Sequence, residues 1–198
     1  MKQEDKIFYG KYADKLEEIR VLMMTEIQTI LDSISTDPET APAEHLKCRI
    51  KGSESLKEKL RKKNMEQTPE YALKNLSDIV GARVVTHFIG DIYTVSDLIE
   101  KSDKWQVRKI KDYIAAPKPN GYRSLHMILR YDHKYYVEIQ LRTISMDTWA
   151  ALEHHIHYKK TASDNDKLII AELKRCADEL ASTDMSMQTI RDMIRKDL

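Results

Sequence analysis

Residues 125–141 read LHMILRY-DHK-YYVEIQL, so apolar and polar side chains alternate on both sides of a short polar turn. Strict alternation predicts two β-strands that each bury one face. The alternating apolar side chains are Leu125, Met127, Leu129 and Tyr131, then Tyr135, Val137, Ile139 and Leu141. Both sets share one core face only if the connecting loop holds an odd number of residues. We therefore expect an antiparallel hairpin with the three-residue loop Asp132-His133-Lys134.

The opposite face of this hairpin carries polar side chains, namely His126, Glu138, Gln140 and Arg142. In the expected register, His126 lies opposite or near Gln140 and Glu138. A polar row on a sheet is usually solvated surface. This one combines an acid, an imidazole, an amide and a guanidinium, which are the groups that the floor of a functional site needs.

Apolar residues at helical spacing surround the hairpin, and short β-branched runs add further strands. Strands and helices together with an antiparallel hairpin indicate the α+β class. The predicted elements are helices over 7–31, from Ser53, over 91–101, from Thr143 or Ser145 and over about 165–195, strands over 82–88 and 105–113, and a proline-containing loop over 36–44.

Composition narrows the class of protein. The chain has 198 residues, of which 33% are charged and 41% hydrophobic, as in soluble globular proteins. No apolar run approaches the ~18 residues of a membrane span, and the N-terminus is polar, so we expect a cytoplasmic protein without a membrane partner. Cys48 and Cys176 lie far apart and do not suggest a disulfide framework.

Charge is unevenly distributed along the chain. The net charge is only +1, which argues against a surface that is basic throughout, but the segment 47–63 holds eight Lys or Arg against two Glu. Such a block is more often a solvated helix face than a site. Phosphate-handling residues elsewhere would change that interpretation.

The segment 112–126 is unlike an ordinary connection. Two prolines stiffen it, and Asn120-Gly121 permits a positive φ. A tyrosine at 122 can stack on a base, while the neighbouring cations can meet phosphates. The polar residues that this rigid loop brings together are Lys118, Tyr122, Arg123 and His126. The alternative is a proline-rich loop with incidental cations.

Four motifs in this order resemble the synthetase domain of the RelA/SpoT family. They are DIVGARVV at 78–85, KPNGYRSLH at 118–126, EIQLRT at 138–143, and Trp149 with Glu153-His154 and Tyr158-Lys159. Upstream, Arg49-Ile50-Lys51 followed by Ser55 and Lys59 resembles the ATP-binding segment of that family. Any one motif would be weak, but together they cover about 47–160 and change the interpretation of the basic block, the polar row and the loop.

The resemblance implies a mixed β-sheet flanked by helices, a nucleotidyltransferase-like synthetase domain, with long N- and C-terminal helices. We expect one synthetase domain over 1–198, whose terminal helices, about 5–34 and 164–196, serve oligomerisation, often as a homotetramer. The longer bifunctional relatives carry hydrolase and regulatory domains. This chain has no room for them, so it resembles the small stand-alone type.

The implied activity is transfer of pyrophosphate from ATP to the ribose 3′-hydroxyl of GDP or GTP, which makes (p)ppGpp. Asp78 and Glu138 match the catalytic metal site of the family, with Mg²⁺ as cofactor. Mg²⁺ prefers one or two carboxylates plus substrate phosphates and waters, so this pair suffices. Glu138 can also orient or deprotonate the acceptor hydroxyl.

The remaining implied site residues fall into a donor group and an acceptor group. Guanidinium planes stack well on bases, and ammonium groups balance phosphate charge. For ATP, Arg49 and Arg83 match the pair that sandwiches adenine, and Lys51, Ser55 and Lys59 match the residues that hold its phosphates. For the acceptor, Tyr122 matches the residue that stacks on guanine, Lys111, Lys118 and His126 would face its 5′-phosphates, and Gln140 would support the site.

Two alternatives remain open at the level of sequence. Toxin-like relatives place pyrophosphate on the 3′ end of tRNA or on adenine nucleotides, although a near-neutral charge argues mildly against tRNA. A non-catalytic tetramer that binds single-stranded RNA is kept open by the basic segment 47–63. The sequence does not decide between GDP and GTP.

Overall fold

The computed structural model describes residues 1–35, 41–158 and 166–196. Its centre is one five-stranded sheet in the order β1-β2-β5-β4-β3. Only β2 and β5 are parallel neighbours, and the other three pairs are antiparallel, so the sheet is mixed and the predicted α+β class is confirmed. The strands are β1 (Ala43–Ile50), β2 (Val80–Thr86), β3 (Gln106–Asp112), β4 (Leu125–Tyr131) and β5 (Tyr135–Thr143).

The hairpin of β4 and β5 has the predicted register. Tyr131 pairs with Tyr135 across a three-residue loop, and His126 pairs with Gln140. Asp132 and His133 adopt positive φ angles of 48° and 52°, which allow the chain to reverse within so few residues. The alternation of side chains along this hairpin therefore separates a core face from a polar face.

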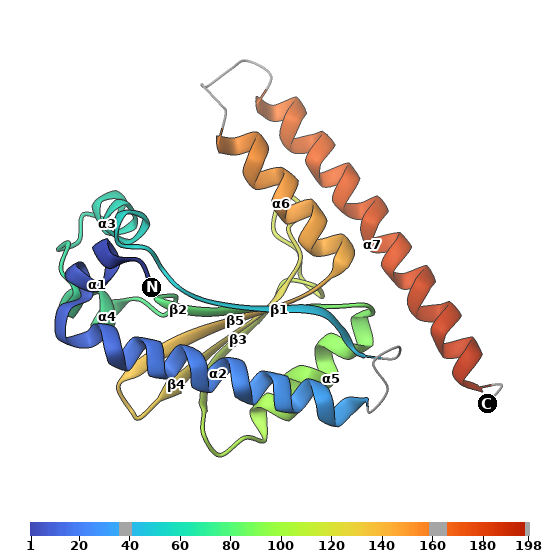
Figure 1. Ribbon diagram of the computed structural model, residues 1–198. Coiled ribbons are helices and arrows are strands. Elements are labelled where there is room, and N and C mark those ends of the chain that lie inside the picture. The colour runs from blue at the N-terminus through green and yellow to red at the C-terminus, as the bar shows by residue number, and fades with distance from the viewer. Residues whose placement is uncertain (36–40, 159–165, 197–198) are drawn as a thin grey trace.

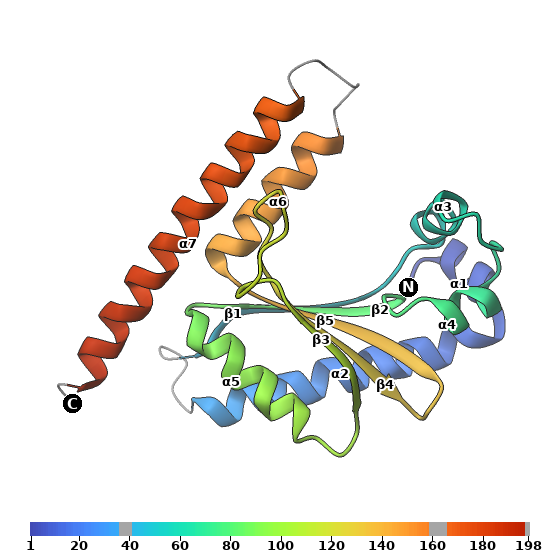
Figure 2. The same ribbon diagram turned by 180° about the vertical axis from the view of Figure 1, so that it is seen from behind.

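Helices on one side of the sheet bury its apolar face. These are α2 (Ala13–Ile34) and α5 (Ile89–Glu100), which lie along the same face in both views (Figures 1 and 2). The short helix α1 (Gln3–Tyr9) lies at the end of the sheet beside α3 (Ser53–Lys62). Ile19, Met23 and Ile27 of α2 are buried at helical spacing and belong to the same core cluster as Val84 and Ile139. The core thus lies between these helices and the sheet.

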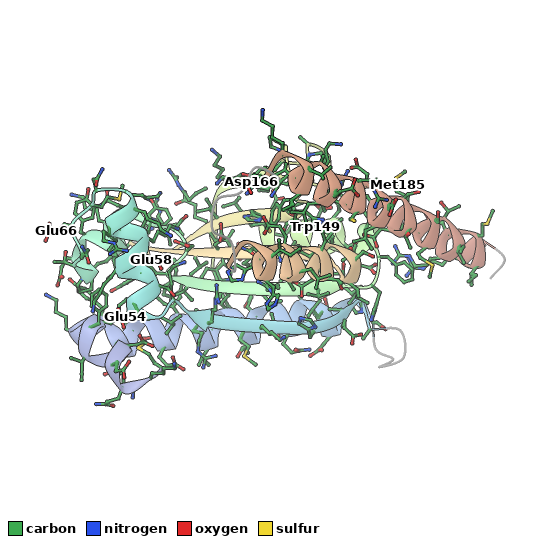
Figure 3. All side chains as sticks on the ribbon, turned by 90° about the horizontal axis from the view of Figure 1, so that it is seen from above. Glu54, Glu58, Glu66, Trp149, Asp166 and Met185 are labelled. Atoms are coloured by element: carbon green, nitrogen blue, oxygen red, sulfur yellow. The ribbon has the colours of Figure 1, made fainter. Side chains whose placement is uncertain are left out.

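The other face of the sheet is covered only at its ends. One end carries α3, with α4 (Pro69–Asn75) nearby, and the other end carries α6 (Ile144–Tyr158) and α7 (Asp166–Lys196). Seen from above, Glu54 and Glu58 mark the α3 end, while Trp149 lies between α6 and α7 (Figure 3). In the described part of the chain, the middle of the polar face is therefore not covered by a helix.

Helix α7 is held to the rest of the molecule by polar contacts as well as by packing. Trp149 Nε1 donates to the Leu173 carbonyl at 2.8 Å, within a small cluster of buried residues. Thr143 Oγ1 donates to Asp184 Oδ2 at 2.5 Å in a buried position. These contacts fix α7 against the junction of β5 and α6.

Several predicted elements need correction. The helix predicted over 7–31 is interrupted by a 3₁₀ turn at Gly10–Tyr12, where Gly10 has a φ of 51°. Ser53 does not cap α3: Gly52 is the N-cap residue, and the Ser53 amide donates instead to Asp5 Oδ1 at 2.6 Å. Strand β1 was not predicted and includes the end of the expected loop over 36–44, of which 36–40 lie outside the described residues.

Other bounds differ by a few residues. The strand expected at 82–88 corresponds to β2, which begins and ends two residues earlier than predicted. Helix α4 was not predicted. Thr143 rather than Ser145 caps α6, because its Oγ1 accepts from the Met146 amide at 3.2 Å. Among the described residues, no helix is both long and apolar enough to cross a membrane.

Candidate functional site

A row of polar side chains crosses all five strands on the face of the sheet away from α2 and α5. In the pairing of the strands, Arg83 of β2 faces Gln140 of β5, and Gln140 faces His126 of β4. Paired residues point to the same face of a sheet, so the pairs combine into one line. The line runs from β1 to β3 as Lys47, Arg83, Gln140, His126 and Lys111.

A cavity of about 280 Å³ opens beside this row. Six of the site residues predicted from the sequence line this cavity, and they come from three strands and the segments that flank them. Both predicted carboxylates, Asp78 and Glu138, line it together with cationic side chains. Its lining residues are Lys47, Arg49, Lys51, Asp78, Gly81, Ala82, Arg83, Glu138 and Gln140.

Asp78 lies just before β2 and is held by two lysines. Lys51 Nζ is 2.9 Å and Lys59 Nζ 2.7 Å from its Oδ2 atom. Burial alone would raise the pKa of Asp78, but the hydrogen bonds and charges of the two lysines outweigh it, so the pKa lies below its ordinary value. The second oxygen, Oδ1, is buried and has no hydrogen-bond partner within residues 1–35, 41–158 and 166–196. Asp78 is thus ionised near neutral pH with one oxygen available.

Glu138 lies on β5 and receives two hydrogen bonds. His126 Nδ1 is 3.3 Å from its Oε1 atom, and Gln140 Nε2 donates to its Oε2 atom at 3.2 Å. Burial raises the pKa of Glu138, but the hydrogen bonds from His126 and Gln140 outweigh this effect, so the net pKa is below its ordinary value. The negative charge of Asp78 acts in the opposite direction and raises the pKa of Glu138, with a smaller effect.

The two carboxylates fit a divalent cation. An ionised, buried carboxylate oxygen without a partner is costly unless a cation or donor meets it, and this is the state of Asp78 Oδ1. Glu138 lines the same cavity. A pair of carboxylates with phosphate oxygens and waters is a donor set that suits Mg²⁺. Among the described residues there is no larger cluster of potential ligands.

Arg49 and Arg83 lie on neighbouring antiparallel strands. Arg49 pairs with Gly81, so Arg83 is its diagonal neighbour on the same face. Diagonal neighbours are roughly 7–8 Å apart. That spacing is about twice the ~3.5 Å contact distance between stacked planar groups, so one flat ring can fit between the two guanidinium groups.

The loop before β4 is built as a rigid support for Tyr122. Gly121 N donates to the Lys118 carbonyl at 2.8 Å, and Tyr122 N donates to Asn120 Oδ1 at 3.2 Å. Gly121 has a φ of 91°, and a Cβ there would lie 2.7 Å from the Cβ of Ala177. Only glycine satisfies both the backbone angle and this close approach to α7.

Tyr122 is the centre of a polar network. Its hydroxyl is 2.8 Å from His126 Nε2 and accepts from Arg142 Nη2 at 2.6 Å. With the His126 proton on Nδ1, the tyrosine donates to the imidazole and the imidazole donates to Glu138. The Lys118 ammonium lies 4.5 Å from the centre of the Tyr122 ring. Tyr122, Lys118 and His126 are thus brought together as predicted.

Some expected residues are placed elsewhere. Arg123 does not join the cations of the loop, because it donates to the Ala177 carbonyl at 3.3 Å and to Asp178 Oδ1 at 3.0 Å on α7. Ser55 is exposed on the first turn of α3 and lines a separate cavity of about 660 Å³ beside the N-terminus. Lys111 pairs with His126 at the far edge of the polar row. Tyr158 and Lys159, part of the last motif, have no described side chain.

Two polar residues of this region were not assigned from sequence. Arg142 was recognised on the polar face of β5 without a role, and Asp147 of α6 was left out. The structure places Asp147 Oδ1 3.1 Å from both Arg83 Nη1 and Arg142 Nη1. No local pattern in the sequence signals this contact, because it forms between the end of β5 and the next helix.

Comparisons with known proteins identify the family of the chain. The family model "Region found in RelA / SpoT proteins" matches residues 48–163, more than half of the chain. The curated GTP pyrophosphokinase YwaC of Bacillus subtilis is 42% identical over 157 residues, which are 76% of this chain and 74% of the relative. The chain therefore belongs to the RelA/SpoT family.

Solved structures of small synthetases resemble this chain over nearly its full length. Small alarmone synthetase 1 of Bacillus subtilis, bound to its product pppGpp, superposes with a TM-score of 0.77 and 28% identity, covering 96% of this chain and 97% of the other. The same protein bound to AMPCPP gives a TM-score of 0.66 with 27% identity, covering 93% and 94%.

Proposed function

We propose that this chain is a GTP/GDP pyrophosphokinase that transfers the β,γ-pyrophosphate of ATP to the ribose 3′-hydroxyl of GDP or GTP and makes (p)ppGpp for the stringent response. The observation that carries the proposal is the pair of ionised carboxylates, Asp78 and Glu138, in one cavity lined with Lys and Arg. Family membership, the relative's name and the pppGpp and AMPCPP complexes of the structural neighbour support the same chemistry.

The donor nucleotide is assigned to the β1–β2 side of the cavity. Arg49 and Arg83 hold the adenine ring between them. Lys51 and Lys59 hold the phosphates and neutralise the charge that develops there, and Ser55 assists from the first turn of α3. Lys51 and Lys59 already contact Asp78. When ATP binds, the two ammonium groups therefore contact both the Asp78 carboxylate and the phosphates.

The acceptor nucleotide is assigned to the β4–β3 side. Guanine stacks on Tyr122, and the cations Lys111 and Lys118 with His126 face its 5′-phosphates. The Lys118 ammonium now lies over the Tyr122 ring, so it moves toward the phosphates when the base stacks there. Gln140 supports the site by its hydrogen bond to Glu138.

In the reaction, the acceptor 3′-oxygen attacks the β-phosphorus of ATP, the bond from that phosphorus to the α-phosphate oxygen breaks, and AMP leaves. Glu138 orients the hydroxyl and accepts its proton. Asp78 and Glu138 would hold Mg²⁺, which supplies neutralisation of charge on the transferred phosphates. His126 donates to Glu138 and so keeps its carboxylate in one orientation.

The same proposal extends to assembly and location. Exposed apolar residues on α7 support a homo-oligomer, proposed as a tetramer. We also propose that the protein acts in the cytoplasm. The basic segment 47–63 supplies Arg49, Lys51 and Lys59 to the donor side, so its charge is explained by ATP rather than by single-stranded RNA.

Glu138→Gln is the substitution that tests this mechanism. It keeps the shape of the side chain but removes the charge and the proton acceptor, so turnover is expected to fall by at least ~10²-fold. The measurement is the rate of product formation with Mg²⁺, ATP and GDP. Arg130→Gln, on the same face of the hairpin but outside the cavity, is the matched control and should keep the wild-type rate. A Glu138→Gln variant with full activity would contradict the mechanism.

A further inference from the structure

Arg142 is a buried cation at the end of β5. Its side chain is only 6% exposed, yet it donates hydrogen bonds to four different groups, the longest of them from Nε to Ser124 Oγ at 3.5 Å. Its guanidinium donates to Asp147 Oδ1 at 3.1 Å, to the Tyr122 hydroxyl at 2.6 Å and to Gln140 Oε1 at 2.9 Å. A buried guanidinium keeps one orientation only when such partners surround it.

Asp147 is shared between Arg142 and Arg83. Its Oδ1 atom lies 3.1 Å from a terminal nitrogen of each guanidinium. The two arginines repel each other: burial lowers the pKa of Arg83, and the charge of Arg142 lowers it further, whereas Asp147 has the opposite effect. One carboxylate oxygen thus holds together two cations that would otherwise move apart.

These contacts form a continuous chain of polar groups from one nucleotide side to the other. Arg83 belongs to the proposed adenine sandwich, and Tyr122 is the proposed support of the acceptor base. Between them lie only Asp147 and Arg142. The chain connects elements that are distant in sequence, namely β2, α6, β5 and the loop before β4.

We infer that Asp147 and Arg142 are positioning residues common to both nucleotide sites: they hold Arg83 for the donor base and Tyr122 for the acceptor base. The inference rests on the proposed function. Its physical basis is preorganisation, because a side chain already fixed in its bound orientation loses less conformational freedom when the ligand arrives. Neither residue needs to touch a nucleotide for this role.

Asp147→Asn is the primary test. It removes the charge that both arginines share, so the KM for ATP and the KM for GDP should each rise by about tenfold, as expected when a hydrogen bond to a charged group is lost. The kcat measured at saturation should change much less. A role in folding alone would lower the amount of active protein and its melting temperature without moving either KM.

The control is Asp178→Asn, which breaks another Arg–Asp pair that touches the acceptor loop. Asp178 pairs with Arg123 and so holds it against α7. Among the described residues, Asp178 forms no ion pair with Arg83. It should leave the KM for ATP unchanged. Asp147→Glu keeps the negative charge. Its KM values for ATP and for GDP should therefore lie between those of the unsubstituted protein and those of Asp147→Asn.

A double-variant cycle tests whether Arg142 and Asp147 act as one unit. Arg142→Lys keeps a positive charge but cannot reach three acceptors at once, so it should raise both KM values on its own. In the Asp147→Asn background its additional effect should be small. Additive effects, or an Asp147→Asn variant in which one KM or neither changes, would overturn the inference.

The same assays separate this inference from the proposed function. If the unsubstituted protein makes (p)ppGpp but Asp147→Asn leaves its KM values unchanged, only the inference fails. If the unsubstituted protein makes no product from ATP and a guanosine nucleotide, the proposed function fails and the inference fails with it.

Discussion

At the scale of single residues, Asp78 and Glu138 show how neighbours determine the charge of a buried acid. Burial favours the neutral form of each carboxyl group, but hydrogen-bond donors outweigh the effect of burial. The donors are two lysines at Asp78, and His126 and Gln140 at Glu138. Each pKa in the folded protein is therefore below its ordinary value of about 4.

The lowered pKa values predict how stability depends on pH. Each carboxyl contributes stability that is fully present above its unfolded pKa of about 4 and is lost as the pH falls through the lower, folded pKa. The free energy of unfolding, measured with urea from pH 7 down to pH 3, should decline at the acid end. The decline should be smaller in Asp78→Asn/Glu138→Gln, and an identical decline in both proteins would contradict this assignment.

Cys48 gives a second prediction at this scale. Burial raises the pKa of its thiol to about 11, while Cys176 on α7 is exposed. Because the thiolate is the reactive form, Cys48 should react with a thiol reagent at pH 7.5 roughly 100-fold more slowly than an exposed thiol of ordinary pKa. Mass spectrometry of timed labelling reactions would measure this, with Cys48→Ser to assign the slow site. Equal labelling rates would refute the prediction.

The sequence predicted much of the site at the residue scale because strand alternation is a local property. The pairing of His126 with Gln140 and the approach of Glu138 followed from one hairpin. Arg123 was placed wrongly and Asp147 was omitted because their contacts are not local in the sequence. Their partners, Asp178 and Arg83, come from other elements, and no spacing within a motif reports such tertiary contacts.

At the scale of elements, the N-terminal helix supports the donor side. Asp5 Oδ1 accepts from the Ser53 amide at 2.6 Å and so caps α3 from outside. The buried Tyr9 hydroxyl donates to the Lys51 carbonyl at 2.7 Å. Both contacts hold the segment that carries Lys51 and Lys59, so we expect α1 to orient the two lysines that are proposed to bind the phosphates.

Tyr9→Phe tests this role of α1. It leaves the Lys51 carbonyl without its donor, which should cost about 1 kcal/mol of stability and raise the KM for ATP with little effect on the KM for GDP. Tyr12→Phe removes the same group from the neighbouring turn and serves as the control. Urea denaturation and steady-state kinetics measure the two effects. Equal changes in both KM values would contradict a role confined to the donor side.

The elements that the sequence analysis missed have physical explanations. In β1 the alternate residues Lys47 and Arg49 are exposed on an edge strand, so their charges were interpreted as part of a basic block rather than as one face of a strand. Helix α4 has seven residues, too few to show helical periodicity. Its start signal was nevertheless present, since Thr68 Oγ1 accepts from the Tyr71 amide and Pro69 follows it.

At the scale of the whole molecule, α7 extends beyond the sheet (Figures 1 and 2). It exposes apolar side chains in its first turn and over its last third. Exposed apolar side chains that gather on one part of a helix indicate an interface, and the group over 185–194 is the larger one here. The exposed apolar residues of α7 are Leu168, Ile170, Met185, Met187, Ile190, Met193 and Ile194. The predicted terminal helix over about 164–196 thus corresponds to α7, apart from residues 164 and 165, which lie outside the described residues.

Ile190→Glu/Met193→Glu tests the proposed oligomer. Burying two carboxylates in an apolar interface is costly, so the mass measured by light scattering should shift toward the monomer. Gln67→Glu adds a charge next to Glu66, which lies at the end of the molecule away from α7 (Figure 3), and should leave the mass unchanged. A monomeric unsubstituted protein, or an oligomer unaffected by the double substitution, would exclude α7 as the interface.

The central claim is that the chain moves pyrophosphate from ATP to a guanosine nucleotide. The most direct measurement incubates the protein with Mg²⁺, ATP labelled at the β-phosphate and, in parallel, GDP, GTP, ATP or bulk tRNA, and separates the products by charge. The account predicts label in guanosine tetra- or pentaphosphate, with an equal amount of AMP released. Label found only in tRNA or an adenosine product, or no transfer at all, would contradict it.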